Sequence, residues 1–112
     1  MGESQNYFTS HLVKISVILN VHNGEHFIKR AIDSVINQTY QPLEIIIWDN
    51  CSTDGTKNII RNYKNLIYYI SKIKTNLGEA REAARKVAKG DWIAYLDVDD
   101  YWYPNRLKEQ IK

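Results

Sequence analysis

Short apolar runs alternate with amphipathic segments along most of the chain, and this alternation restricts the fold more than any other sequence feature. Four runs are rich in β-branched and aromatic side chains and are too short for apolar helices, which is typical of buried strands. They lie at Ile15–Val21, Leu43–Trp48, Leu66–Ile70 and Trp92–Leu96. We therefore expect four strands, separated by the segments that follow each run.

A segment with helical character follows each predicted strand. After the first strand, apolar residues recur at spacings of three and four and form one stripe of a helix. Ser52 to Gly55 offer capping oxygens for a helix over about 56–63, small residues dominate 80–88, and Pro104 precedes a last helix at 105–112. This order predicts an α/β domain whose mostly parallel sheet is flanked by helices on both faces.

Length and composition restrict the remaining choices. A chain of 112 residues corresponds to one domain, and its net charge of +2 is too small to indicate nucleic acid as a partner. The single cysteine, Cys51, excludes an internal disulfide and is expected to be a spectator thiol in a reducing compartment. No apolar run approaches the length of a membrane span. We expect a soluble cytoplasmic protein, compatible with a peripheral position at the inner face of a membrane.

Polar residues follow three of the four predicted strands, where a parallel sheet collects its ligands. Asn20 and His22 end the first, Asp49 and Asn50 the second, and Asp97, Asp99 and Asp100 the fourth. Because the carboxyl ends of parallel strands meet at one edge, these residues are predicted to form a site.

The segment Asp97-Val98-Asp99-Asp100 is the most specific element of that site. Neighbouring carboxylates repel one another unless a cation lies between them. In an extended segment Asp97 and Asp99 point the same way, and oxygen ligands of this kind suit Mg²⁺ or Mn²⁺ with phosphate oxygens. The alternative is a solvated acidic turn that caps the following helix.

The other polar residues have more than one interpretation. Asp49 and Asn50 can hold a ribose hydroxyl or a base edge, or Asp49 can cap the helix after Ser52. The first strand is not followed by a Gly-x-Gly-x-x-Gly turn or a P-loop, so dinucleotide and P-loop nucleotide binding are excluded. His22 and His26 are expected to hydrogen-bond or face solvent instead of sharing a metal. Arg81 and Arg85 are expected to pair with Glu82 or solvent, although both can reach a diphosphate.

Five stretches resemble the family 2 glycosyltransferases, whose fold is called GT-A, and they follow that family's order from residue 14 to 112. They are ISVILNVHNG at 15–24, AIDSVINQTY at 31–40, EIIIWDNCSTDGT at 44–56, NLG at 76–78 and AKGDWIAYLDVDDYWYPNRL at 88–107. The resemblance implies a Rossmann-like nucleotide-diphospho-sugar transferase fold and inverting transfer of a sugar to an acceptor hydroxyl, in bacterial cell-surface polysaccharide or lipopolysaccharide synthesis. The acceptor is expected to be a saccharide or a lipid-linked molecule.

The resemblance also assigns roles to individual residues. By analogy, Asn20 and His22 line the base pocket, and Asp49 with Asn50 holds the base. Asp97 contacts ribose or metal, and Asp99 ligates the Mn²⁺ or Mg²⁺ that bridges the diphosphate. His22 stands where the family usually has tyrosine, and Asn50 stands where many members have a second aspartate. The identity of the nucleobase in the donor is therefore not fixed, and a UDP-sugar is the default expectation.

The resemblance further implies that the chain is truncated. Residues 14–112 correspond to the nucleotide-sugar-binding half, after a polar extension at 1–13, whereas the acceptor-binding half with its general base is absent. We expect weak nucleotide binding and no sugar transfer by these residues alone. The fourth strand should then have an open edge, Trp102 and Tyr103 should be exposed, and the chain should form homo-oligomers.

Three other functions are alternatives to the transferase. A non-catalytic nucleotide-binding or regulatory α/β module fits the same residues. A flavodoxin-like receiver would need acidic residues after its first and third strands and a later lysine, an arrangement that is absent. A metal-dependent hydrolase would need a histidine-rich or two-metal ligand set, which is also absent.

Overall fold

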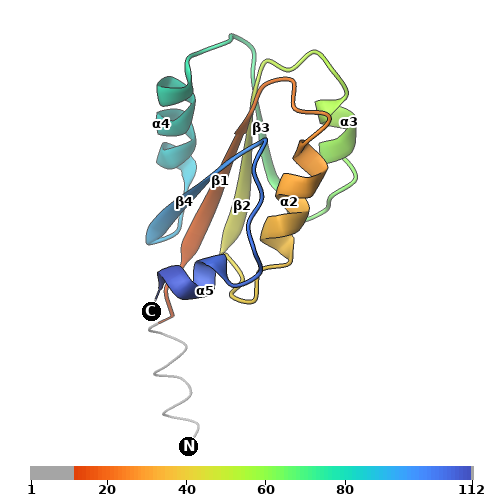
Figure 1. Ribbon diagram of the computed structural model, residues 1–112. Coiled ribbons are helices and arrows are strands. Elements are labelled where there is room, and N and C mark those ends of the chain that lie inside the picture. The colour runs from red at the N-terminus through yellow and green to blue at the C-terminus, as the bar shows by residue number, and fades with distance from the viewer. Residues whose placement is uncertain (1–11, 112) are drawn as a thin grey trace, which may run out of the picture.

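The computed structural model describes residues 12–111 (Figure 1), so most of the polar extension expected at 1–13 lies outside the described residues. Strands and helices alternate as the sequence predicts. The order is β1 (Ile15–Val21), α2 (Ile28–Ile36), β2 (Glu44–Asn50), α3 (Thr56–Ile60), β3 (Ile67–Ser71), α4 (Leu77–Val87), β4 (Trp92–Asp97) and α5 (Arg106–Gln110).

The four strands form one parallel sheet in the order β3-β2-β1-β4, which confirms the predicted fold class. β1 is central and pairs with β2 on one side and β4 on the other. Its register sets Val17 beside Ile45 and Ala94, and sets Asn20 beside Trp48 and Asp97. Because all four strands run the same way, their carboxyl ends share one edge of the sheet.

Helices cover both faces of the sheet, so β1 is buried on both sides (Figure 1). Val17 and Leu19 point to the face packed by α2, α3 and α5, where Ile32 and Leu107 complete a large apolar cluster. Ile18 points to the opposite face, where Ala84 of α4 lies on the sheet. The small residues of α4 allow this close packing of helix on sheet.

One helix ends earlier than the sequence predicts, and another has a start that the structure defines more closely. Helix α3 stops at Ile60, three residues before the expected Tyr63. Tyr63 instead turns toward α2, and its hydroxyl donates a 2.6 Å hydrogen bond to Asp33. Helix α4 begins after Asn76, whose side chain accepts from the Glu79 N–H while the Glu79 carboxylate accepts from the Asn76 N–H. This capping box fixes the start of α4 at the site edge of the sheet.

Trp102 is buried, which contradicts the expectation that it is exposed; only Tyr103 is exposed as predicted. The chain after β4 runs back over the α2 face of the sheet toward α5 (Figure 1), so Trp102, 5% exposed, joins that apolar cluster. Gln38 holds this return segment, because its amide nitrogen donates to the Tyr103 carbonyl at 2.7 Å and its amide oxygen accepts from the Leu107 N–H at 3.0 Å.

β3 and β4 form the two edges of the sheet, and within the described residues neither has a second strand partner. Trp92 stands on the β4 edge with 65% of its surface exposed. An edge strand with a large exposed apolar side chain is suited to pairing with another chain or segment.

Candidate functional site

The carboxyl edge of the sheet carries a hollow of about 310 Å³ between β1, β2 and the start of α4. It is lined by Asn20, Val21, His22, Asn50, Lys74, Thr75, Asn76, Leu77 and Ala80. Three of the seven residues that the sequence indicated as a site, Asn20, His22 and Asn50, therefore surround one cavity. Its walls come from the ends of β1 and β2, the loop before α4 and the first turn of α4, because the parallel strands deliver their ends to the same place.

His22 is held at the rim of this hollow by a contact with the neighbouring strand. Its Nδ1 lies 2.7 Å from the carbonyl oxygen of Asn50, and its Nε2 lies 3.4 Å from the amide nitrogen of Asn23. The ring itself is exposed. Both nitrogens therefore have partners in the protein, and the face of the ring is left available for stacking.

Asn50 forms part of the wall of the hollow. Its amide oxygen accepts from the Thr75 N–H at 3.0 Å, and its amide nitrogen donates to the Thr75 carbonyl at 2.7 Å. The side chain thus ties β2 to the loop before α4. An amide can make this paired contact with a backbone, whereas a carboxylate at the same position has no N–H to donate.

Asp49 is completely buried behind that wall. One carboxylate oxygen accepts from the Ser52 N–H at 3.0 Å, and the other accepts from the Tyr68 hydroxyl at 2.5 Å. Burial, together with the hydrogen bond to this carboxylate, raises the pKa of Tyr68. Asp49 therefore stabilises the turn at Ser52, while helix α3 begins later, after Gly55.

The acidic segment after β4 is a turn, which corrects the expectation of an extended segment. β4 ends at Asp97, and the Asp100 N–H donates a 3.0 Å hydrogen bond back to the Asp97 carbonyl. Strand alternation therefore stops before Asp99, and it no longer places Asp97 and Asp99 on the same side. Val98 packs tightly against Gly24, where an added Cβ would lie 2.7 Å from the valine methyl.

Two arginines lie next to this acidic turn. The Arg81 guanidinium of α4 is 3.2 Å from the Asp97 carboxylate and lies over the Tyr95 ring, 5.1 Å from its centroid. On the other side, Arg30 donates a 3.3 Å hydrogen bond to the main-chain carbonyl of Asp99. The acidic turn is thus partly neutralised from both faces of the sheet.

The expected pairing of Glu82 is correct for one arginine and wrong for the other. Arg85 contacts Glu82 through two nitrogens, at 2.6 and 3.0 Å, whereas Arg81 reaches across to Asp97. The reason is geometric: Arg81 faces the last residues of β4, and Arg85 lies one helical turn farther from the site edge.

Hard-cation chemistry fits the exposed carboxylates at this edge, although no closed metal centre is built. Among residues 12–111, no three His, Cys, Asp or Glu side chains converge. A Mg²⁺ or Mn²⁺ ion needs only one or two protein carboxylates when phosphate oxygens and water complete its octahedron. Asp97 and Asp99 are exposed and can serve in that way, whereas His26 points into solvent with 84% of its side chain exposed.

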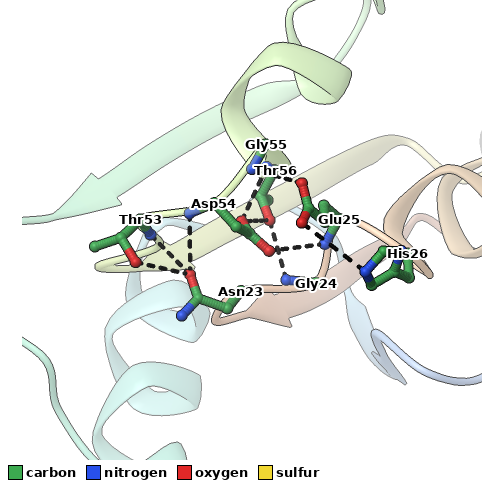
Figure 2. Close-up of polar contacts among 8 residues, drawn as sticks. All are labelled: Asn23, Gly24, Glu25, His26, Thr53, Asp54, Gly55 and Thr56. Atoms are coloured by element: carbon green, nitrogen blue, oxygen red, sulfur yellow. Dashed lines mark hydrogen bonds and ion pairs between the residues drawn. The ribbon is translucent and has the colours of Figure 1, made fainter.

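A network of hydrogen bonds between the β1–α2 and β2–α3 loops was not predicted from the sequence (Figure 2). Asn23, with a left-handed φ of 51°, accepts from the Thr53 N–H at 2.7 Å and from the Asp54 N–H at 3.3 Å. Asp54 in turn accepts from the Thr56 N–H and the Glu25 N–H. We call these residues, with Gly24 and Gly55, the loop clasp.

The loop clasp holds the His22 loop against the turn that follows Asp49 and Asn50. The Glu25 carboxylate accepts from the Gly55 N–H at 2.9 Å, and the Thr56 hydroxyl accepts from the Gly24 N–H at 3.0 Å. Partial burial would raise the pKa of Asp54, but the hydrogen bonds from Thr56 and Glu25 outweigh it and lower the pKa. The sequence signal for the clasp was the Asn23-Gly24 and Asp54-Gly55 pairs, which favour tight turns.

Comparison with known proteins matches this chain to one family. The model of the family described as glycosyl transferase family 2 matches residues 16–112. An uncharacterized glycosyltransferase of Rickettsia prowazekii (strain Madrid E) is 37% identical over 97 residues, which are 87% of this chain and 30% of that protein. The Escherichia coli UDP-Glc:alpha-D-GlcNAc-diphosphoundecaprenol beta-1,3-glucosyltransferase WfaP is 38% identical over 99 residues, 87% of this chain and 39% of that enzyme.

A solved structure gives the same result. The crystal structure of S. aureus TarS in complex with UDP superposes with a TM-score of 0.79 and 32% identity, over 88% of this chain and 31% of that one. This chain thus spans less than half the length of each of these three relatives. Within its described part, no helix combines the length and apolar character needed to cross a membrane.

Proposed function

Because this chain belongs to glycosyl transferase family 2, we propose that residues 14–112 are the nucleotide-sugar-binding part of a glycosyltransferase. The observation that carries the proposal is the hollow at the carboxyl edge of the sheet, which lies close to a cationic and acidic pair, Arg81 and Asp97. A nucleoside diphosphate has matching parts: a flat base for the hollow, and a charged diphosphate for the pair.

The base is proposed to enter the hollow between His22 and the start of α4. His22 offers the face of its ring, Asn20 lines the inner wall, and Asn50 holds the opposite wall through Thr75. Asp49 is buried and has both oxygens occupied, so it acts by fixing this wall. A uracil base is the default, and the TarS complex supports it, since that relative binds UDP.

The diphosphate is proposed to lie over the end of β4. Arg81 supplies positive charge there, and exposed Asp97 and Asp99 would hold Mn²⁺ or Mg²⁺ together with phosphate oxygens. When bound, such a cation neutralises the charge that develops on the departing diphosphate. Arg81 can exchange its contact with Asp97 for one with a phosphate, because both partners are partly exposed.

The reaction proposed for the whole enzyme is inverting transfer. The bond between the sugar's anomeric carbon and the diphosphate breaks as the acceptor oxygen forms its new bond on the opposite face of the carbon. A general base must take the proton of the acceptor hydroxyl. We propose that this base lies in an acceptor-binding part outside residues 14–112, since this chain covers only 30% and 39% of the two curated relatives.

A saccharide or lipid-linked acceptor is proposed, in the synthesis of a bacterial cell-surface polymer on the cytoplasmic side of the membrane. This is supported by WfaP, whose name specifies a diphosphoundecaprenol-linked acceptor. Self-association through the exposed β4 edge is part of the same proposal, since an open edge strand favours pairing with a second chain.

Titration calorimetry of the chain with UDP, with and without Mn²⁺, tests the proposal. We expect binding that Mn²⁺ strengthens and that Asp99→Asn makes insensitive to Mn²⁺. The matched control is Asp91→Asn, because Asp91 is also exposed but lies before β4, at the opposite edge of the sheet. Absence of binding to UDP, GDP and CDP alike would refute the proposal, whereas metal-independent binding would favour the non-catalytic module.

A further inference from the structure

Two buried polar atoms on the α4 face of the sheet have no hydrogen-bond partner among the described residues. They are the amide oxygen Oδ1 of Asn20 and the indole nitrogen Nε1 of Trp48. Buried polar atoms in native proteins are nearly always paired with protein or with an ordered water. A pair of such atoms beside a binding hollow therefore indicates a contact that the polypeptide alone does not supply.

The two atoms are chemically complementary and come from neighbouring positions. The indole N–H can only donate, and the amide oxygen accepts. Asn20 and Trp48 are register partners on adjacent strands, and both project to the α4 side of the sheet, as Ile18 and Ile46 do two residues earlier. One water molecule between them can accept from the indole and donate to the amide, as buried waters commonly do.

Such a bridge fixes the orientation of the Asn20 amide. With the oxygen held inward by the water, the NH₂ group is the end that faces the hollow lined by Asn20. The neighbouring polar side chains are occupied: both amide atoms of Asn50 contact Thr75, and both nitrogens of His22 have partners. On the β1 and β2 side of the hollow, the Asn20 NH₂ group is thus the described side-chain donor left to recognise a ligand, while Lys74 and Asn76 line the hollow from the loop before α4.

We propose that Asn20 determines the base specificity of the donor site and that Trp48 is its positioning residue. This inference rests on the proposed function. The NH₂ group donates to the carbonyl at C4 of the nucleobase, where cytosine carries an amino group instead, so the site selects uracil over cytosine. Trp48 acts only through the buried water, while its ring stacks on Tyr69 at 5.4 Å between centroids.

The ratio of the dissociation constants for CDP and UDP, measured by calorimetry, tests the role of Asn20. UDP and CDP differ at the base position where a carbonyl replaces an amino group. We expect the chain to bind UDP about tenfold more tightly than CDP, the difference that one hydrogen bond of about 1.4 kcal/mol provides. In Asn20→Asp the carboxylate can only accept, so the ratio should fall to one or below. Asn62→Asp, on an exposed residue, should leave the ratio unchanged.

Trp48→Phe tests the positioning role, because phenylalanine keeps an aromatic ring against Tyr69 and removes the N–H. We expect the preference for UDP to weaken several-fold, with UDP affinity itself changing less. The matched control is Trp92→Phe on the exposed β4 edge, which should keep the tenfold ratio. Because the readout is a ratio between two ligands, a general loss of stability would lower both affinities and leave it unchanged.

The outcomes separate this inference from the proposed function. Equal binding of UDP and CDP by the unaltered chain overturns the inference and leaves the proposed function standing. An unchanged ratio in Asn20→Asp also overturns it, and an unchanged ratio in Trp48→Phe refutes the positioning role. Failure to bind UDP, CDP or GDP overturns both. If Asn20→Asp does not fold, the ratio in the unaltered chain and in Trp48→Phe still decides.

Discussion

Nδ1 of His22 lies 2.7 Å from the main-chain carbonyl oxygen of Asn50. Because a carbonyl oxygen only accepts, this nitrogen must carry the proton, and in the neutral ring Nε2 is then the acceptor. The amide nitrogen of Asn23 lies 3.4 Å from Nε2 on the other side. The imidazole is therefore held by both edges, and the exposed ring lines the rim of the hollow.

The first prediction concerns the tautomer of His22. Nitrogen-15 NMR at neutral pH should show the Nδ1-protonated form for His22. His26 serves as the internal control, because its exposed ring makes, among residues 12–111, only a 3.9 Å contact with Glu25. A predominantly Nε2-protonated His22 would contradict the arrangement.

The second prediction concerns the buried carboxylate of Asp49. Tyr68→Phe removes the hydroxyl that donates to Asp49 and leaves one carboxylate oxygen buried without that donor. Such a loss costs about 1–3 kcal/mol of unfolding free energy. Urea unfolding should show this decrease, whereas Tyr69→Phe, on the exposed neighbouring position, should change stability by less than about 0.5 kcal/mol. Equal effects of the two substitutions would refute the role of the hydrogen bond.

The third prediction is a pH dependence that comes from the loop clasp. The pKa of Asp54 is lower in the folded chain than in the unfolded chain, so its contribution to stability is fully present above the unfolded value of about 3.9. That contribution is lost as the pH falls from about 4 through the lower folded pKa.

Asp54→Asn isolates this contribution from those of other carboxylates. The variant should be less stable than the unaltered chain at pH 7, by about 1–2 kcal/mol, because it loses charge-assisted hydrogen bonds from Thr56 and Glu25. The difference between the two proteins should shrink when urea unfolding is repeated at pH 3. A constant difference at both pH values would show that the charge of Asp54 is not involved.

The sequence predicted the fold because local patterns and global topology agree. The β-branched run at Ile15–Val21 has the length of a strand, and it became the central strand buried on both faces. That the four strands form a parallel sheet then followed from the alternation of strands and helices alone. The same rule placed Asn20, His22 and Asn50 around one hollow, although β1 and β2 are separated by a helix.

The details that the sequence did not predict depend on partners distant in the chain. Strand alternation suggested that Asp97 and Asp99 share a face, but a hydrogen bond between Asp100 and Asp97 turns the chain first. Likewise, Trp102 is buried because Gln38, 64 positions earlier, holds the return segment by its backbone. Neither contact leaves a periodic signal in the sequence, so neither can be predicted from patterning.

The fourth prediction concerns the open β4 edge. If the chain self-associates there, light scattering at high concentration should show a dimer or larger species, and Trp92→Lys should shift it toward monomer. A charged side chain on an edge strand opposes pairing with another edge. Leu43→Lys is the control, since Leu43 is also exposed but lies before β2, away from that edge. A monomer at every concentration would contradict self-association.

The last prediction separates the two roles that Arg81 can play at the proposed diphosphate site. Its guanidinium lies 3.2 Å from the Asp97 carboxylate, so it both supplies positive charge to an incoming diphosphate and competes with a cation for Asp97. Removing the charge in Arg81→Gln should therefore have opposite effects in two titrations. UDP binding without metal should weaken by about fivefold, the effect of losing about 1 kcal/mol of ionic attraction. The affinity of Mn²⁺ for the UDP complex, followed by electron paramagnetic resonance, should rise because Asp97 is released.

Arg85→Gln is the matched control on the same helix, since Arg85 pairs with Glu82 and not with the acidic turn. If Arg81→Gln weakened Mn²⁺ and UDP binding alike, Asp97 would not be a metal ligand, and Asp99 would be the carboxylate left for that role.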